Sequence, residues 1–145
     1  LRRRFSFVEM QPKPELLEPL EDLDLQTMLE TINYRIEILF DRDHRIGHAY
    51  FMNIATADNP LEALKTTFQK NIIPLLQEYF YGDYAKIGAV LGEAFITQPK
   101  PITGTTTFAK GNWDIDAADY RPVYELKDIS AFKDTTPFIA IYAAG

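Results

Sequence analysis

Residues 43–51 have the sequence Asp43-His44-Arg45-Ile46-Gly47-His48-Ala49-Tyr50-Phe51. Two histidines, an arginine and an aspartate lie around one glycine, and no other part of the chain is as dense in polar chemistry. A helical pattern lies on each side. Because Gly47 interrupts a helix, the stretch is predicted to connect the two, with a short helix from His48 to Ile54 that buries Tyr50 or Phe51.

The helix before this stretch is predicted from about Leu23 to Asp41, where apolar residues recur every three or four positions. That spacing places them on one buried face. Asp22 or Asp24 can cap the helix by accepting hydrogen bonds from its first free amides. The apolar positions are Leu25, Met28, Leu29, Ile32, Ile36, Leu39 and Phe40.

The helix after the stretch begins at Asn59-Pro60-Leu61-Glu62, which supplies a capping asparagine, a proline at the first turn and a glutamate that can reach back. Pro74 lies inside it and predicts a kink. A final short helix is predicted from Asp83 to Gly92. Together these elements are expected to form a small helical domain over residues 15–94. The apolar stripes are Leu61, Leu64, Phe68, Ile72, Leu75, Leu76 and Tyr79, then Ile87, Val90 and Leu91.

The two ends of the chain differ from this helical part. Phe5 and Phe7 follow three arginines in an alternating pattern, which predicts an edge strand that has no partner strand nearby. With the linker Gln11-Pro12-Lys13-Pro14, this strand makes up residues 1–14. Residues 95–145 contain β-prone runs separated by Pro, Gly and Asp, which predict a small antiparallel sheet of two to four strands. The runs are Phe95-Ile96, Thr105 to Phe108, Val123 to Leu126 and Phe138 to Tyr142. The expected fold is therefore mainly α, and α+β overall.

Composition narrows the function classes. A chain of 145 residues, 46% apolar and 25% charged, fits one compact domain or a domain with an appendage. No apolar run reaches the ~20 residues of a membrane helix, and a net charge of -6 argues against a dedicated nucleic-acid surface. Without cysteines or a signal-peptide pattern, a cytoplasmic protein is expected. A first residue other than methionine is consistent with a fragment or a processed product.

Metal sites are the first alternative to consider. His44 and His48 are four residues apart, a spacing that on a continuous helix could bring both imidazoles to one metal, with Asp41 and Asp43 completing the site, as in a metal hydrolase. Gly47 and the missing intervening glutamate argue against this, and a histidine that bonds to backbone is the simpler interpretation. Three aspartates beside Trp113 lack the glycine and glutamate of a calcium loop, so a solvated turn is expected at Asp114, Asp116 and Asp119. No metal site is predicted.

Three stretches resemble, in order, segments of McrB-type AAA+ GTPases, the motor subunits of methylation-dependent restriction systems. They are Leu-Arg-Arg-Arg-Phe at residues 1–5, Arg-Ile-Gly-His-Ala-Tyr-Phe at 45–51 and Ile-Pro-Leu-Leu-Gln-Glu-Tyr-Phe at 73–80. The resemblance implies the last strand of an AAA+ core followed by the helical lid. It covers Leu1 to about Gly92 and says nothing of the residues that follow.

By this resemblance Arg4 is an arginine-finger candidate and Arg3 a second interface arginine, facing the nucleotide of a neighbouring subunit. Arg45 or His48 would approach the nucleotide from the lid. The complete AAA+ protein to which such a lid would belong, called the parent protein below, would use GTP, or ATP, with Mg²⁺. It would form a hexameric ring and drive DNA translocation with an endonuclease partner. No phosphate-binding Gly-x-x-x-x-Gly-Lys-Ser/Thr loop and no magnesium-binding acidic strand end occur in the chain, so it should not hydrolyse nucleotide alone.

Two simpler interpretations stay open. Three arginines near a terminus are often just a solvated run. The whole chain could instead be a non-enzymatic helical module whose β tail recruits a protein partner. The upstream coding sequence distinguishes the helical module from the AAA+ motor. A phosphate loop there favours the motor, and a reading frame that opens near Leu1 favours the module.

Overall fold

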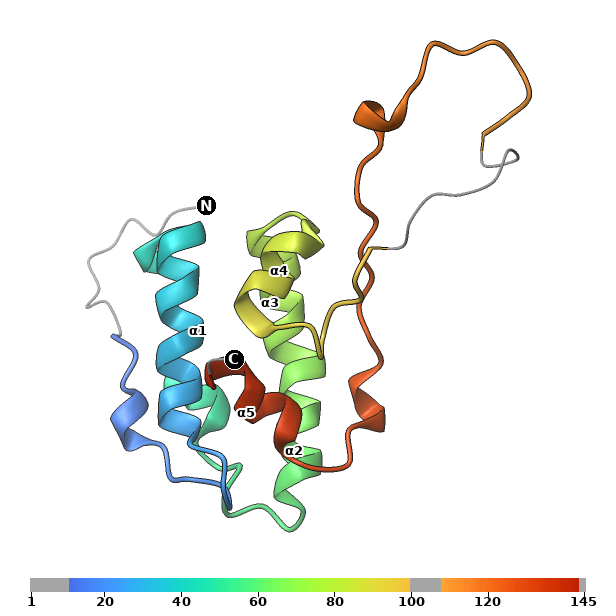
Figure 1. Ribbon diagram of the computed structural model, residues 1–145. Helices are drawn as coiled ribbons and strands as arrows, with labels where there is room; N and C mark the ends of the chain where they lie inside the picture. The colour runs from blue at the N-terminus through green and yellow to red at the C-terminus, as the bar shows by residue number, and fades with distance from the viewer. Residues whose placement is uncertain (1–10, 100–107, 144–145) are drawn as a thin grey trace.

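Figure 1 shows the computed structural model, which describes residues 11–99 and 108–143. The predicted strand at Phe5 and Phe7 lies outside these residues. The described part is mainly helical, as predicted. Its helices are α1 (Leu25–Leu39), α2 (Pro60–Thr67), α3 (Ile73–Tyr79), α4 (Tyr84–Leu91) and α5 (Thr136–Tyr142). Shorter turns are η1 (Pro14–Leu16), η2 (Arg42–His44), η3 (His48–Phe51), η4 (Phe68–Ile72), η5 (Ala117–Asp119) and η6 (Ile129–Ala131).

Helix α1 begins where its cap predicts. Of the two candidate aspartates, Asp24 is the cap, since its carboxylate accepts hydrogen bonds from the Thr27 amide at 3.1 Å and the Thr27 hydroxyl at 2.7 Å. These bonds hold the pKa of Asp24 below its ordinary value. The predicted apolar face is buried at Leu25, Met28, Leu29, Ile32 and Ile36.

Helices α2 and α3 follow one another without a break, joined by the π-helical turn η4. Asn59 caps α2 by accepting from the Glu62 amide at 3.2 Å. In the π-turn the Ile73 amide donates to the carbonyl of Phe68, five residues back. Pro74 follows directly and cannot donate. The kink predicted at this proline stays a prediction; the structure has a widened π-helical turn just before Pro74, after which the helix continues to Tyr79.

The predicted β tail is not confirmed, and its last strand is wrong. Residues Phe138 to Tyr142 lie in helix α5, which Pro137 starts at its first turn. Phe138 and Ile141, three positions apart, both face the core and are buried. Burial on one helical face outweighs the β propensity of this run. Among the described residues of the tail, the β pairing consists of one antiparallel bridge between Ile96 and Leu126.

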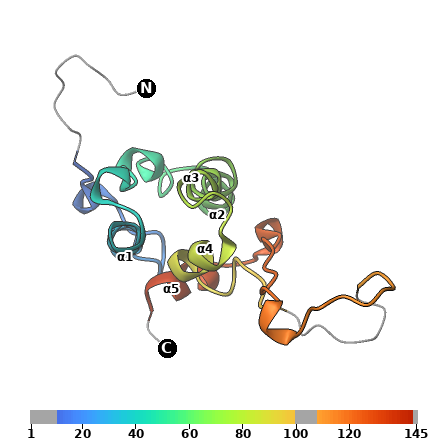
Figure 2. The same ribbon diagram turned by 90° about the horizontal axis from the view of Figure 1, so that it is seen from above.

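This tail packs into the same hydrophobic core as the helices before it. Helix α5 lies beside α1 (Figures 1 and 2). The ring centroid of Phe68, on the π-turn, is 5.6 Å from that of Phe95 and 5.0 Å from that of Phe138. Lys65 fixes the segment before α5: its buried ammonium donates to the carbonyls of Ser130 and Phe132, each at 2.9 Å, and pairs with Glu62 at 2.7 Å.

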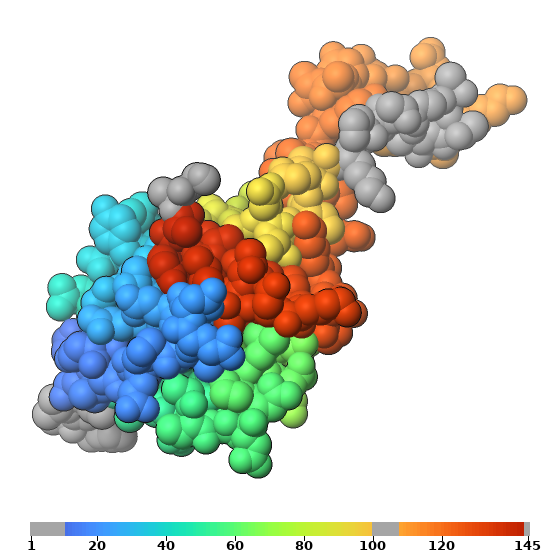
Figure 3. Space-filling view, turned by 60° about the horizontal axis from the view of Figure 1, so that its bottom comes forward, coloured from blue at the N-terminus to red at the C-terminus, as the bar shows by residue number. Residues whose placement is uncertain are grey.

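One segment stands apart from this core. The arm, residues 108–123, extends away from the helices (Figures 1 and 3), and every side chain along it is exposed. Among the described residues, the helices are all too short or too polar to cross a membrane.

Candidate functional site: the loop between α1 and α2

One buried side chain joins the loop between α1 and α2 to helix α1. Asn33, on the core face of α1, is 5% exposed and donates from Nδ2 to the Ile46 carbonyl at 2.9 Å. Its Oδ1 accepts from the Ile46 amide at 2.6 Å. The side-chain amide thus satisfies both backbone groups of a buried residue. This clamp sets the path of the chain on either side of Ile46, at Arg45 and Gly47.

Arg45 points from this clamp toward the linker, Gln11 to Pro14. Its Nε donates to the Arg42 carbonyl at 2.9 Å and its Nη2 donates to Oε1 of Gln11 at 2.8 Å. Both acceptors are neutral. The guanidinium also lines a groove of about 220 Å³ whose other walls are Pro12, Pro14, Glu30, Asn33, Tyr34 and Glu37.

His48 also contacts the linker. Its Nδ1 lies 3.0 Å from the backbone nitrogen of Lys13 and accepts that amide's proton. The ring is therefore neutral in this arrangement, with its own proton on Nε2. Both nucleotide-binding candidates, Arg45 and His48, thus bond to the linker that leads into α1. The short helix predicted here is the 3-10 turn η3, which buries Phe51 and leaves Tyr50 exposed.

His44 has a different set of partners. Its Nδ1 lies 2.6 Å from Oδ1 of Asp41, and its ring centroid is 4.5 Å from that of Phe40 and 5.0 Å from that of Tyr79. Burial of the Tyr79 side chain is the main cause that raises the pKa of its phenol, and the nearby Tyr50 and acidic groups raise that pKa further. The two histidines therefore serve separate contacts. Within residues 11–99 and 108–143, no group of three or more His, Cys, Asp and Glu side chains could hold a metal.

The Asp41–His44 contact predicts a pH effect. The hydrogen bond from His44 holds the pKa of Asp41 below its ordinary 3.8. Because the folded-state pKa is depressed, this contribution is present above pH 3.8 and is lost as the pH falls through the lower folded value. Asp41→Asn is therefore expected to lose less stability than the wild type as the pH falls below 3.8 in urea titrations. The difference is small because the pair is exposed, and identical pH profiles would contradict it.

Two side chains with structural hydrogen bonds, Asn33 to the loop and Arg35 to helix α4, were not predicted from the sequence. Asn33 carried a readable signal, since it is a polar residue among the apolar positions of α1. Arg35 did not: it donates to the Val90 carbonyl at 2.8 Å and so satisfies the end of α4, 55 residues away. Arg3 and Arg4, the arginine-finger candidates, lie outside the described residues.

Comparison with known proteins places these elements in a family. The family described as McrB, alpha-helical lid domain, matches residues 24–88. The match covers α1, the clamped loop, the continuous helix through α3 and the first half of α4. No curated protein matches the chain. Residues 24–88 therefore form an α-helical lid domain of the McrB type.

Proposed function

We propose that this chain is the lid part of a McrB-like AAA+ motor of a restriction system, and that the loop between α1 and α2 couples bound nucleotide to movement of the lid. One observation carries the proposal. Arg45 and His48 are fixed to the lid through the Asn33 clamp and also bond to the linker at Gln11 and Lys13. A core that precedes the linker would therefore reach the lid through these two side chains.

The chemistry of Arg45 suits a nucleotide switch. Its present acceptors, an amide oxygen and a backbone carbonyl, are uncharged. A phosphate is a stronger partner for a guanidinium, because charge-assisted hydrogen bonds are about twice as strong as neutral ones. Glu30 and Glu37 line the groove beside Arg45, so a phosphate would approach from the linker side. When a phosphate replaces the Gln11 side chain as the hydrogen-bond partner of Arg45, the linker would be released and the lid could rotate.

The remaining parts of this proposal concern the parent protein. GTP, or ATP, with Mg²⁺ would bind in an AAA+ core that precedes this lid. Arg4, with Arg3 beside it, would act on the nucleotide of the next subunit of a hexameric ring. The ring would work with an endonuclease subunit and move DNA. The lid contributes rotation rather than chemistry.

A matched pair of arginine variants in the parent protein tests the role of Arg45. Arg45→Ala is expected to lower kcat/KM for the nucleotide at least about tenfold, which corresponds to ~1.4 kcal/mol. Arg42→Ala, which removes a neighbouring exposed arginine, should leave kcat/KM within about twofold. Steady-state hydrolysis with Mg²⁺ measures both. Equal activity of Arg45→Ala and the wild type would rule out the coupling role.

The chain by itself is expected to show no GTPase or ATPase activity, because a phosphate loop and a magnesium-holding acidic pair are needed for turnover. Phosphate release from purified residues 1–145 is the measurement. Hydrolysis that follows this chain through successive purification steps, and scales with its concentration, would show that the lid assignment is incomplete.

A further inference from the structure

The linker contains a four-residue motif that occurs at a second place in the chain. Gln11-Pro12-Lys13-Pro14 and Gln98-Pro99-Lys100-Pro101 have the same sequence. Each motif carries one lysine and no acidic residue, and the lysine amide is the one backbone donor between its two prolines. The second motif therefore has the groups to make the contacts that hold the first motif on the lid.

The first motif lies in a seat made of Arg45, His48 and the groove of about 220 Å³ beside them, called the linker groove below. Gln11 accepts from Arg45 Nη2 at 2.8 Å, and the Lys13 amide donates to His48 Nδ1 at 3.0 Å. The two prolines of the motif are half-buried and line the groove, whereas Gln11 and Lys13 are exposed. Recognition thus uses one side-chain amide oxygen, one backbone N–H and two proline rings.

Charge favours a motif of this kind in the linker groove. Glu30 and Glu37 give its walls two negative charges and Arg45 gives one positive charge, which leaves a net charge of -1. The lysine of the motif complements that charge. Tyr34, which is 67% exposed, adds an aromatic wall, and proline-rich segments commonly bind in aromatic-lined grooves.

The second motif starts from a fixed point at the base of the arm. The Thr97 amide donates to the Glu125 carbonyl at 2.8 Å, and the Glu125 amide donates to the Thr97 hydroxyl at 2.9 Å. Gln98, which follows, is exposed, and Pro99 is half-buried. The glutamine is thus held at the surface, as Gln11 is in the first motif.

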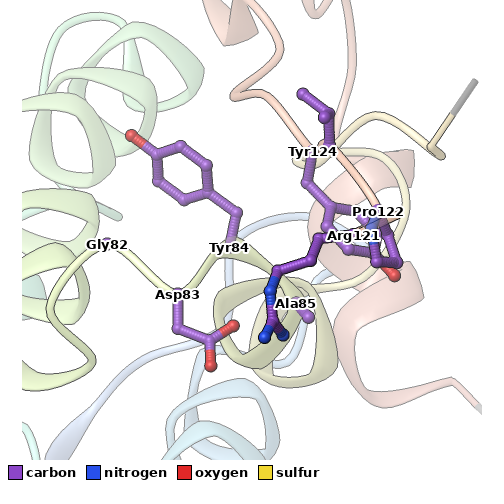
Figure 4. A pocket seen from close by; sticks show the side chains of 8 residues that line it. Gly82, Asp83, Tyr84, Ala85, Arg121, Pro122 and Tyr124 are labelled. Carbon is purple, nitrogen blue, oxygen red and sulfur yellow. The ribbon is translucent and has the colours of Figure 1, made fainter. Parts of the chain in front are cut away.

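A second groove near this base is not selective by charge. It has a volume of about 520 Å³ and lies between the start of α4 and residues 121–124 (Figure 4). Asp83 and Arg121 both line it, so the charges of its walls cancel. The linker groove differs, because the structure shows a segment of defined sequence bound in it.

The two motifs lie on opposite sides of the bundle. The linker runs beside α1, whereas residues 95–99 lie on the side of α4 that faces away from α1 (Figures 1 and 2). The bundle therefore separates the second motif from the seat of its own chain. A neighbouring copy has no such barrier. A contact between opposite sides of two copies repeats head to tail, which closes a ring or extends a filament.

We infer that the seat binds the second motif of a neighbouring copy of this chain, with Gln98 accepting from Arg45 and the Lys100 amide donating to His48. The inference rests on the proposed function in one respect, because the chain's own linker must first leave the seat, as it does when a phosphate replaces Gln11 on Arg45. Once that phosphate departs, the neighbour's motif competes with the linker. Its binding keeps the lid released, so the position of one lid depends on the next subunit.

Fluorescence anisotropy with a labelled peptide of residues 97–103 tests the seat directly. A full-length chain in which residues 11–14 are replaced by Gly-Ser-Gly-Ser, called the vacated chain, is expected to bind this peptide. The wild type should bind at least tenfold more weakly, because its tethered linker has a high effective concentration at the seat. In the vacated chain, Arg45→Ala and His48→Ala should each weaken binding at least tenfold. Arg42→Ala is the matched control and should keep the Kd within about twofold.

Two variants of the peptide test the backbone contact. Lys100→Pro removes the amide proton that His48 would accept, and should weaken binding at least tenfold. Lys100→Arg keeps both the amide and the charge, and should bind within about twofold of the original peptide. Circular dichroism checks that the vacated chain keeps its helices. The milder Gln11→Ala chain, which only weakens the linker, should bind the peptide more tightly than the wild type and provides the test if the vacated chain is disturbed.

Sedimentation equilibrium shows whether the same contact joins whole chains. The vacated chain is expected to associate over low to high micromolar concentrations, and the added changes Gln98→Ala and Lys100→Pro should return it to a monomer. A vacated chain that stays monomeric, a seat that does not bind the peptide, or a Lys100→Pro peptide of unchanged Kd would each overturn the inference. These measurements contain no nucleotide. Unchanged kcat/KM in Arg45→Ala would instead overturn the proposed function and leave peptide binding as it is.

Discussion

A chain that ends at Gly92 is expected not to unfold cooperatively, although it contains the whole family match. Among the described residues, truncation removes five buried apolar side chains, namely Phe95, Ile96, Ile129, Phe138 and Ile141. At ~1.5–3 kcal/mol each, their burial contributes roughly 8–15 kcal/mol. A domain of this size has a net stability of about 5–15 kcal/mol. Thermal unfolding of residues 1–92, followed by circular dichroism and calorimetry, should therefore show no sharp transition.

The matched control removes the arm and keeps the tail. Residues 108–121 can be replaced by a short Gly-Ser loop, since the Ile96–Leu126 bridge holds the two ends together. This variant should melt within a few degrees of the full chain, because the arm contributes no buried side chain. A cooperative transition in the Gly92 truncation, at a temperature near that of the full chain, would show that the lid folds without its tail.

Asn33→Ala is expected to destabilise the folded chain by about 2–5 kcal/mol. The substitution leaves the amide and carbonyl of Ile46 without their partner, and Ile46 is 1% exposed. Each buried backbone group left unsatisfied costs about 1–3 kcal/mol. Urea unfolding at neutral pH measures the effect as a lower midpoint with an unchanged slope.

An exposed asparagine supplies the control for this prediction. Asn53→Ala, in the loop after η3, should change stability by no more than about 0.5 kcal/mol. In the parent protein, Asn33→Ala should also reduce nucleotide turnover, because the clamp holds Arg45 in place. Equal urea midpoints for the two variants would show that the clamp is dispensable.

The helices could be predicted because their signals are local. Asp24, Asn59 and Asp83 each accept from a backbone amide at the start of a helix, and the three- and four-residue spacing gave the buried faces. The run from Phe138 to Tyr142 is β-prone and by itself predicts a strand. The preceding Thr136-Pro137 is the local signal for a helix start, and only together with it does the run indicate helix α5. The run becomes helical because it is buried against helix α1 and Phe68, both of which lie far away in the sequence.

The candidate site was predictable in its residues and not in its contacts. Arg45 and His48 stood out by type and by resemblance, and Asn33 could have been found as an interruption of an apolar stripe. Their bonds to Gln11 and Lys13 span more than thirty residues, so they depend on how the linker runs across the lid. Neither the spacing nor the composition of the sequence encodes that path directly.

The hydrogen bonds between the start of α1 and the two ends of α5 have a mechanical consequence. The Asp24 amide donates to the Tyr142 hydroxyl at 3.1 Å, and the Thr135 hydroxyl donates to Asp22 at 2.7 Å. Force that arrives through the preceding residues would therefore load the first and last helices together. Helix α1 would then move with the bundle and would not separate from it at its first turn.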